Sequence, residues 1–274
     1  MQLGYKNVYG TNKGSNNLFN FPLITVLTVN KMQDNGAEIY MTGLDFEKIW
    51  VARVEDYPIQ RVFANEDELD FSKKFSGGDG SENNPYIIKN ADELHSMTSA
   101  AASKTRGKYF MLAKDITDNT ELVNNRVLIR KNNEFSVFYG CFDGGGHTVY
   151  GIYRTGTGNG ALFPNVWPLN GTPAEIKNIG IESSYINASA AGGIIGSLSN
   201  STGKGSFSMN SCYVGKNVEI NGKTIQGGLV GSMDNPAVSI KNSYSLALLS
   251  GKVDSDKQGG IIGFTASAAI GASV

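Results

Sequence analysis

One glycine phrase recurs three times in the second half of the chain: Gly192-Gly193-Ile194-Ile195-Gly196, Gly227-Gly228-Leu229-Val230-Gly231 and Gly259-Gly260-Ile261-Ile262-Gly263. Successive copies begin at Gly192, Gly227 and Gly259, so the interval between them is nearly constant. A weaker copy, Gly158-Asn159-Gly160-Ala161-Leu162-Phe163, precedes the first by a similar interval. A fixed interval of this length is typical of proteins built from stacked structural repeats.

A second phrase keeps the same interval. Asn178, Asn210 and Asn242 are equally spaced, and each lies in a short partly apolar segment. If the repeats stack in register, these asparagines are expected to form a ladder in which each amide bonds to the next. The repeated glycines are expected where the backbone needs a positive φ or where two backbones crowd together. Both sets of residues are therefore interpreted as structural.

Short alternating apolar runs such as Val218-x-Ile220 and Val238-x-Ile240 fill the intervals between the glycine phrases. They are too short for amphipathic helices, and the long helical stripes of helical repeat proteins are absent. Short strands separated by Gly, Asn and Ser turns favour a coil of about three strands. Successive coils stack about 4.8 Å apart, each strand bonding to its counterpart one repeat away. The sequence thus predicts an all-β solenoid.

A short helix is predicted in front of the repeats. A Gly-rich loop from Phe75 leads into a strand near Tyr86, and Asn90 then provides a favourable N-cap with Glu93 three residues later. One apolar stripe includes Leu94, and the helix is expected to end near 104–107. Such a helix would cap the open end of the hydrophobic core. Further strands are expected at 109–113, 127–130 and 136–142.

Residues 1 to about 72 differ from the rest because they carry more charge and no glycine interval. We expect 1–72 to be a small β-rich region, or the tail of an upstream domain, and 73–274 to be the solenoid domain. The dipeptide Asn35-Gly36 is a hairpin signal between the first two expected strands. The strand-like runs are 21–29, 37–41, 48–54 and 59–63.

Composition excludes several classes of function. The 274 residues include 24 basic and 25 acidic ones, so no overall charge attracts nucleic acid or an anionic membrane. No apolar run reaches the roughly 18 residues needed to insert in a membrane, and 18–29 is interpreted as a strand and not as a signal peptide. Cys141 and Cys212 favour two buried free thiols, with a disulfide between them as the alternative. The chain ends inside a coil, as expected of a fragment or of a disordered last stretch.

The repeated Gly-Gly-Leu-Val-Gly, interleaved with Asn210-Ser211-Cys212-Tyr213, resembles the GLUG motif of bacterial surface and secreted proteins. These include the non-catalytic repeat regions of some immunoglobulin A proteases. The segments 75–88 and 142–149 match the order of such modules, and the resemblance covers about residues 75 to 264. It implies a right-handed parallel β-helix, an extracellular or cell-surface location, and adhesion as the usual assumption. The chain lacks His-Glu-x-x-His, so the protease activity of those relatives does not carry over.

Candidate catalytic residues are few. Parallel β-helices often cleave acidic polysaccharides, which requires calcium-binding aspartates or two carboxylates about 5–10 Å apart. In the early coils the candidates are Asp115, Asp118 and Asp143, of which Asp143 is better explained by turn formation. Asp254 and Asp256 are expected in a solvated turn. No catalytic residue is assigned.

No cofactor or metal is expected. Of the two histidines, His95 is expected to be partly exposed on the capping helix, and His147, after the glycine turn, is expected to pack or to form a hydrogen bond instead of binding a metal. The turn at 144–146 lacks the Lys-Ser/Thr of a phosphate-binding loop. Basic residues are scattered, so nucleic-acid binding is not predicted.

Aromatic residues are the candidate binding residues. Exposed aromatics along one face would suit a glycan or a host surface protein, whereas core packing or tyrosine ladders are the alternative. Trp167, in an interrupted Pro164–Pro168 loop, is expected to protrude, and Tyr153 and Tyr185 are the other candidates. The recurring aromatics of the repeat region are Tyr150, Tyr153, Trp167, Tyr185, Tyr213 and Tyr244.

The function predicted from the sequence is non-enzymatic: a surface-exposed or secreted module with adhesin-like binding, or a structural stalk. The alternative is a polysaccharide lyase or hydrolase built on the same fold.

Overall fold

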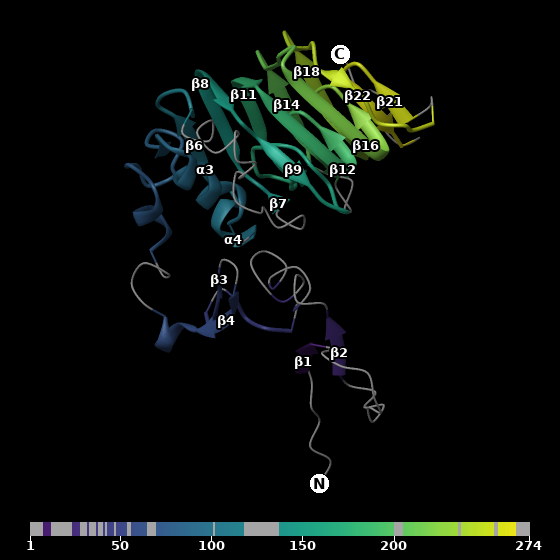
Figure 1. The fold of residues 1–274 in the computed structure, drawn as a ribbon. Helices are drawn as coiled ribbons and strands as arrows, with labels where there is room; N and C mark the ends of the chain where they lie inside the picture. The colour runs from purple at the N-terminus through teal and green to yellow at the C-terminus, as the bar shows by residue number, and fades with distance from the viewer. Residues whose placement is uncertain are drawn as a thin grey trace.

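The chain folds into a parallel β-solenoid of about four turns (Figure 1). The description rests on a computed structural model. It covers residues 8–11, 24–27, 32, 37, 41, 43–46, 48–53, 56–64, 70–100, 102–117, 137–199, 205–234, 237–254 and 257–266. Within these residues strands dominate and helices are few, which confirms the predicted all-β class.

Three sheets form the faces of the solenoid, and each full coil adds a strand to all three. The first sheet contains β5 (Tyr86–Ile88), β6 (Tyr109–Leu112), β8 (Cys141–Tyr150), β11 (Glu175–Glu182), β14 (Phe207–Asn210), β15 (Tyr213–Val214), β18 (Val238–Lys241) and β19 (Tyr244–Ser245). The second contains β9 (Tyr153–Thr155), β12 (Ser184–Gly192), β16 (Val218–Gly227), β20 (Leu248–Leu249) and β21 (Gln258–Gly259). The third contains β7 (Val137–Phe138), β10 (Phe163–Val166), β13 (Ile195–Ser199), β17 (Val230–Asp234) and β22 (Ile262–Thr265).

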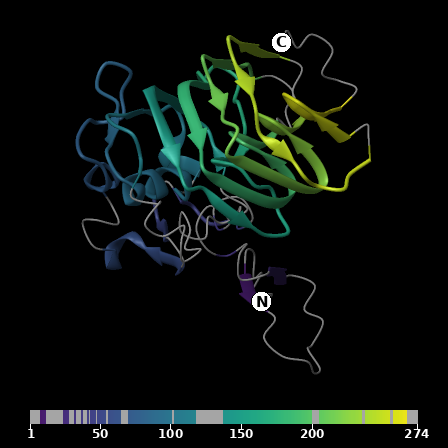
Figure 2. The ribbon, with the colours of Figure 1, turned by 45° about the horizontal axis from the view of Figure 1, so that its top comes forward.

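The strands of each sheet pair in parallel with their counterparts one coil away, as stacking of repeats requires (Figure 2). The four coils begin at β8, β11, β14 and β18 and end at β10, β13, β17 and β22. In Figure 2 the coils follow one another from teal to yellow, and the helices lie at the blue end.

The glycine phrases stack in register. Gly192 pairs with Gly227, and Gly227 pairs with Gly259. None of these glycines has a positive φ. Crowding explains them instead: a Cβ added to Gly227 would collide with the carbonyl oxygen of Val230 and the amide nitrogen of Gly263 in the next coil. Of the two reasons expected for glycine, close backbone approach is therefore the one that applies.

The asparagine phrase is displaced by one residue in the third coil. Asn210 pairs with Lys177 and Lys241, whereas Asn178 and Asn242 share a left-handed corner with Ser211, at φ of 53°, 50° and 55°. The buried residues of the neighbouring register position (Ile176, Met209 and Ile240) set this alignment, because a shift of one residue would turn them outward. Of the asparagine ladder expected along Asn178, Asn210 and Asn242, the described residues therefore keep only the bond between Asn242 and Asn210, while Asn178 bonds to an aspartate instead. Asn178 Nδ2 donates to Asp143 Oδ1 at 3.0 Å, and Asn242 Nδ2 donates to Asn210 Oδ1 at 2.9 Å.

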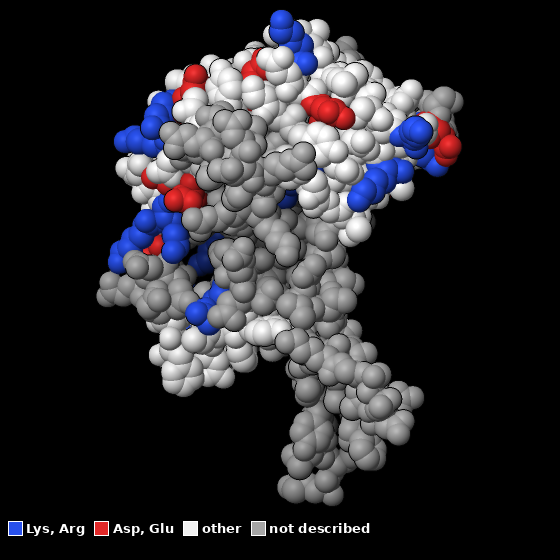
Figure 3. Space-filling model, in the orientation of Figure 1, with Lys and Arg blue, Asp and Glu red and all other residues white. Residues whose placement is uncertain are grey.

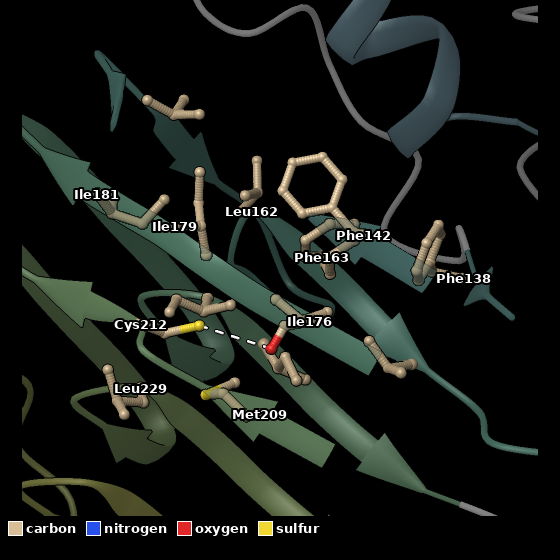
Figure 4. Close-up of a cluster of buried hydrophobic side chains, with 14 of the residues drawn as sticks. Phe138, Phe142, Leu162, Phe163, Ile176, Ile179, Ile181, Met209, Cys212 and Leu229 are labelled. Carbon is tan, nitrogen blue, oxygen red and sulfur yellow. Dashed lines mark hydrogen bonds between the residues drawn. The ribbon is translucent and has the colours of Figure 1, made fainter. Parts of the chain in front are cut away.

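A single hydrophobic core runs through the solenoid. It is aromatic at the N-terminal end, where Phe110, Phe138 and Phe163 pack ring against ring, and aliphatic in the later coils. Figure 4 shows part of it, with the Cys212 thiol directed at the carbonyl oxygen of Ile176 at 3.6 Å. Cys141 and Cys212 are both free and buried, so the alternative of a disulfide between them is excluded.

The predicted helix begins as expected and closes the aromatic end of the core. The Glu93 amide donates to the N-cap side chain Asn90 Oδ1 at 2.8 Å. Leu94 and Met97 are fully buried members of the same core. The helix is shorter than expected and is split into α3 (Ala91–Thr98) and α4 (Ala102–Thr105). No helix in the described part of the chain is both long and apolar enough to cross a membrane.

The described residues of the N-terminal region form two strand pairs. Parallel β1 (Val8–Thr11) and β2 (Ile24–Leu27) form one, and antiparallel β3 (Trp50–Arg53) and β4 (Asp56–Gln60) form the other. Two 3₁₀ helices follow, η2 (Arg61–Phe63) and η3 (Phe71–Lys74). Of the strand expected at 37–41, the structure describes only the two ends, and there it is wrong, because Ala37 is helical and the Met41 amide bonds to its carbonyl at 2.9 Å. The turn at 35–36, the strand at 127–130, Asp118 and Asp256 lie outside the described residues.

Candidate functional site

Trp167 lies after β10 on the third sheet and packs against its neighbours. Its ring meets Tyr139 edge to face, with centroids 6.2 Å apart, and the two residues share a small cluster with Val137. The side chain is half-buried. Trp167 was expected to protrude, but in the structure its ring packs against Tyr139, because a large aromatic ring is stabilised by contact with another ring.

Tyr153 and Tyr185 pair in register on the second sheet, and their rings stack with centroids 5.5 Å apart. Asn187 Nδ2 donates to the Tyr185 hydroxyl at 3.3 Å. The next residue in register is Glu219, so the tyrosine column ends after two coils. The structure thus brings two of the three aromatic candidates together, while Trp167 belongs to another sheet.

A second tyrosine pair lies on the first sheet. Tyr213 and Tyr244 pair in register, and their rings are nearly parallel at 5.6 Å. Tyr244 is 52% exposed, and the Tyr213 hydroxyl is 2.9 Å from Thr148 Oγ1. Two separate tyrosine ladders therefore exist, which was one of the alternatives expected for the aromatic residues.

An open groove on the first sheet crosses successive coils. It has a volume of about 730 Å³ and is hereafter the axial groove. One register column runs along it, with one residue from each of five strands that are neighbours in the sheet: Tyr109, Cys141, Glu175, Ser208 and Ser239. Because strands stack about 4.8 Å apart, five residues in such a column span roughly 19 Å. The groove therefore runs parallel to the solenoid axis.

A lysine bridges two carboxylates beside the axial groove. Lys177 Nζ lies 2.7 Å from Glu175 Oε2 and 4.0 Å from Asp143 Oδ2, so the separation of these two oxygens cannot exceed the sum of the two distances. Ser208 Oγ donates to the other oxygen of Glu175 at 3.3 Å. The hydrogen bond to Glu175 is the main cause of the raised pKa of Lys177. The cluster is thus held by its own hydrogen bonds.

Asp143 has the bonds expected of a turn residue. Its Oδ1 accepts from the Gly145 amide at 2.8 Å as well as from Asn178. His147 Nδ1 lies 3.2 Å from Asp115 Oδ1, which also accepts from the Thr148 amide at 3.0 Å. No group of three or more His, Cys, Asp or Glu side chains within the described ranges could hold a metal ion.

The two thiols are poor nucleophiles. Burial raises the pKa of Cys141 and of Cys212 to about 11. A thiol attacks through its thiolate, so neither residue is activated near neutral pH. Figure 3 shows basic and acidic side chains next to one another on the described part of this face, which fits the near balance of 24 basic and 25 acidic residues.

No protein-family model and no curated protein matches the chain. It is similar to a solved structure from Bacteroides ovatus described as "a putative immunoglobulin A1 protease", with 20% sequence identity and a TM-score of 0.49. The match covers 71% of this chain and 66% of that one, so the chain spans less than two thirds of that protein. A likeness at this level carries no argument about function.

Sequence reasoning located the tyrosines but missed the axial groove. The groove depends on which residues of different coils share a register column, and the column mixes four residue types, Tyr, Cys, Glu and Ser, so no repeated residue reveals it. A periodic search of the outward positions could have found the column once the buried positions had fixed the register.

Proposed function

We propose that this chain is a non-enzymatic binding module that holds an extended glycan along the axial groove. The observation that carries the proposal is the register column, which presents a side chain from every coil at a constant spacing. An extended sugar chain also repeats at short, regular intervals, so successive sugar units can meet successive coils.

The chemistry of the groove suits a hydroxylated ligand. Ser208 and Ser239 supply hydroxyl groups, Glu175 supplies a carboxylate, and Tyr109 supplies a partly exposed phenol. Sugar hydroxyls both donate and accept hydrogen bonds, and a carboxylate acceptor gives the stronger, charge-assisted bonds. The apolar part of the lining comes from Pro173 and residues near it, which can meet the C–H faces of sugar rings.

The same proposal places the module outside the cell, with adhesin-like binding as its role. It is supported by the GLUG-like glycine phrases, which are similar to those of bacterial surface and secreted proteins. Surface labelling of intact cells against lysed cells, with an antibody to this chain, tests the location. A signal that appears only after lysis would contradict it.

Binding is tested by retention of the purified chain on a panel of immobilised polysaccharides and mucin. We expect Ser208→Phe and Ser239→Phe to fill the groove and abolish retention. Ser232→Phe is the matched control, because Ser232 faces outward on the third sheet. No retention of the unmodified chain, or equal loss in all three variants, would contradict the proposal. Retention on mucin that survives periodate oxidation of its glycans would point to a protein partner instead.

Glycoside hydrolysis is the second candidate, favoured by the short separation of the Glu175 and Asp143 carboxylates on either side of Lys177. Glycosidases place two carboxyl groups about 5–9.5 Å apart. Lys177 lies close to both, however, and its single positive charge is paired mainly with Glu175. A hydrolase would release reducing ends from a bound polysaccharide. The variants Glu175→Gln and Asp143→Asn would then release none. Retention without any release of reducing ends excludes it.

A further inference from the structure

A second, smaller depression lies at the corner where the first sheet turns. It has a volume of about 420 Å³, within the usual range of small-molecule pockets, and is hereafter the corner hollow. Three consecutive coils line it, with Asp143, Gly146, Asn178, Ser211 and Tyr213 as the residues used below.

The hollow exists because the first coil carries extra residues at this corner. Asp143 pairs with Lys177 and His147 pairs with Ile179, so three residues of the first coil stand opposite a single residue of the second. All three are glycines, and a Cβ added to Gly146 meets no atom within 4 Å. The space beside the bulge is therefore left free of side chains.

Several residues that line this space have polar atoms with spare hydrogen-bonding capacity. Asp143 Oδ1 is occupied by two donors, but Oδ2 is 4.0 Å from Lys177, beyond hydrogen-bond range. Asn178 uses its Nδ2 toward Asp143, and its Oδ1 accepts no hydrogen bond from the described residues. Among the described residues, the hydrogen bond of Ser211 Oγ is a long one, 3.4 Å to Asn210 Oδ1. The hollow thus offers two acceptors and a hydroxyl, with the Tyr213 ring as its apolar wall.

We propose that the corner hollow binds a single neutral pyranose unit, such as a branch or terminal sugar of the glycan. The mixture of carboxylate, amide oxygen and hydroxyl matches the adjacent hydroxyls of a sugar ring, which donate and accept together. An anionic ligand is disfavoured, because the Asp143 carboxylate would repel it. The inference rests on the proposed glycan-binding function, since the axial groove lies on the same sheet.

The left-handed corners provide a matched pair of variants. Asn178→Gly removes the amide from the hollow, and glycine adopts the positive φ without strain. Asn242→Gly makes the same change at the equivalent corner two coils on, outside the hollow. Each variant loses one amide hydrogen bond of nearly the same length, so their effects on the fold are comparable. Ser211→Asn is a third variant, which narrows the hollow with a residue that tolerates the same conformation.

The experiment follows amide resonances of Gly145, Gly146 and Ser211 by NMR during titration of the full chain. The probes are methyl α-mannopyranoside, methyl β-galactopyranoside, methyl β-glucopyranoside and methyl N-acetyl-β-glucosaminide. At least one probe is expected to shift these resonances saturably. We expect binding to be about tenfold weaker in Asn178→Gly and in Ser211→Asn, and unchanged in Asn242→Gly.

Two outcomes overturn the inference: no saturable shift at these residues with any of the four probes, or equal weakening in both glycine variants. If the unmodified chain is still retained on polysaccharide, and Ser208→Phe is not, the proposed glycan binding in the axial groove holds although the corner hollow binds no sugar. If neither the probes nor the polysaccharides bind, the inference and the proposed function fail together.

Discussion

The ring of Tyr213 lies over the backbone of Gly180, one coil below, where any Cβ on Gly180 would collide with it. From there the hydroxyl reaches Thr148 Oγ1, two coils down, at 2.9 Å. A single side chain therefore ties three coils together, and it can do so only because the middle coil has glycine at this position.

We predict that Gly180→Ala destabilises the fold by displacing the Tyr213 ring. Overpacking of this kind usually costs about 1–3 kcal/mol. The free energy of unfolding in urea measures the effect. The double variant Gly180→Ala/Tyr213→Ser lacks the ring, so its free energy of unfolding should be only a little lower than that of Tyr213→Ser alone. Additive losses would show that the collision is not the cause.

Gly227→Ala should be more damaging than Gly260→Ala, although both glycines belong to the repeated phrase. The added methyl at Gly227 meets backbone atoms of Val230 and Gly263, which cannot move aside without breaking the stack. At Gly260 an added Cβ meets no atom within 4 Å. We expect a loss of about 3 kcal/mol for the first and within about 0.5 kcal/mol for the second, measured by urea unfolding. Equal effects would refute the crowding explanation.

Gln226 is fully buried, and we predict that Gln226→Leu destabilises the third and fourth coils. Its Oε1 accepts from the Gly251 amide at 2.9 Å, and its Nε2 donates to the Gly251 carbonyl at 2.9 Å and to Gln258 Oε1 at 3.0 Å. Each buried group left without a partner costs about 1–3 kcal/mol. The control is Gln258→Leu at the exposed partner, for which a smaller loss of thermal stability is expected. The reverse order would contradict this role.

Stability should fall above pH 9 because of the two buried thiols. The folded state raises the pKa of Cys141 and Cys212 from 9.0 to about 11, so it holds their protons more tightly than the unfolded chain does. This contribution is fully present below about pH 9 and is lost between pH 9 and 11. Urea midpoints at pH 7, 9 and 10 measure it. The Cys141→Ala/Cys212→Ala variant should show a weaker decline over the same range, and an identical decline would contradict the assignment.

The sequence predicted the solenoid because the feature that fixes it is periodic. The repeated Gly192, Gly227 and Gly259 mark one register position, and the structure pairs them as expected. The capping helix was also predictable, since Asn90 and Glu93 encode its start locally. Both predictions rest on residues whose role is set within one repeat or one turn.

Features that depend on exact alignment between coils were not predictable. Asn210 has the same spacing in the sequence as Asn178 and Asn242. Ser211 nevertheless occupies the left-handed corner of its coil, because the buried residues determine the strand register. The environment of Trp167 depends on Tyr139, which lies far earlier in the chain and carries no signal of the contact. The axial groove was missed for the same reason.

The two ends of the solenoid are protected differently. At the N-terminal end the loop at Ser76 and Gly77 bonds to Ile87 on the outer edge of β5, with distances of 2.9 Å. Strands β18 and β22 of the fourth coil pair on one side only within the described residues. Local unfolding of the solenoid should therefore start at the fourth coil and proceed toward the N-terminal end. Backbone amides of the fourth coil are expected to exchange with deuterium first, and those beside the aromatic end of the core last.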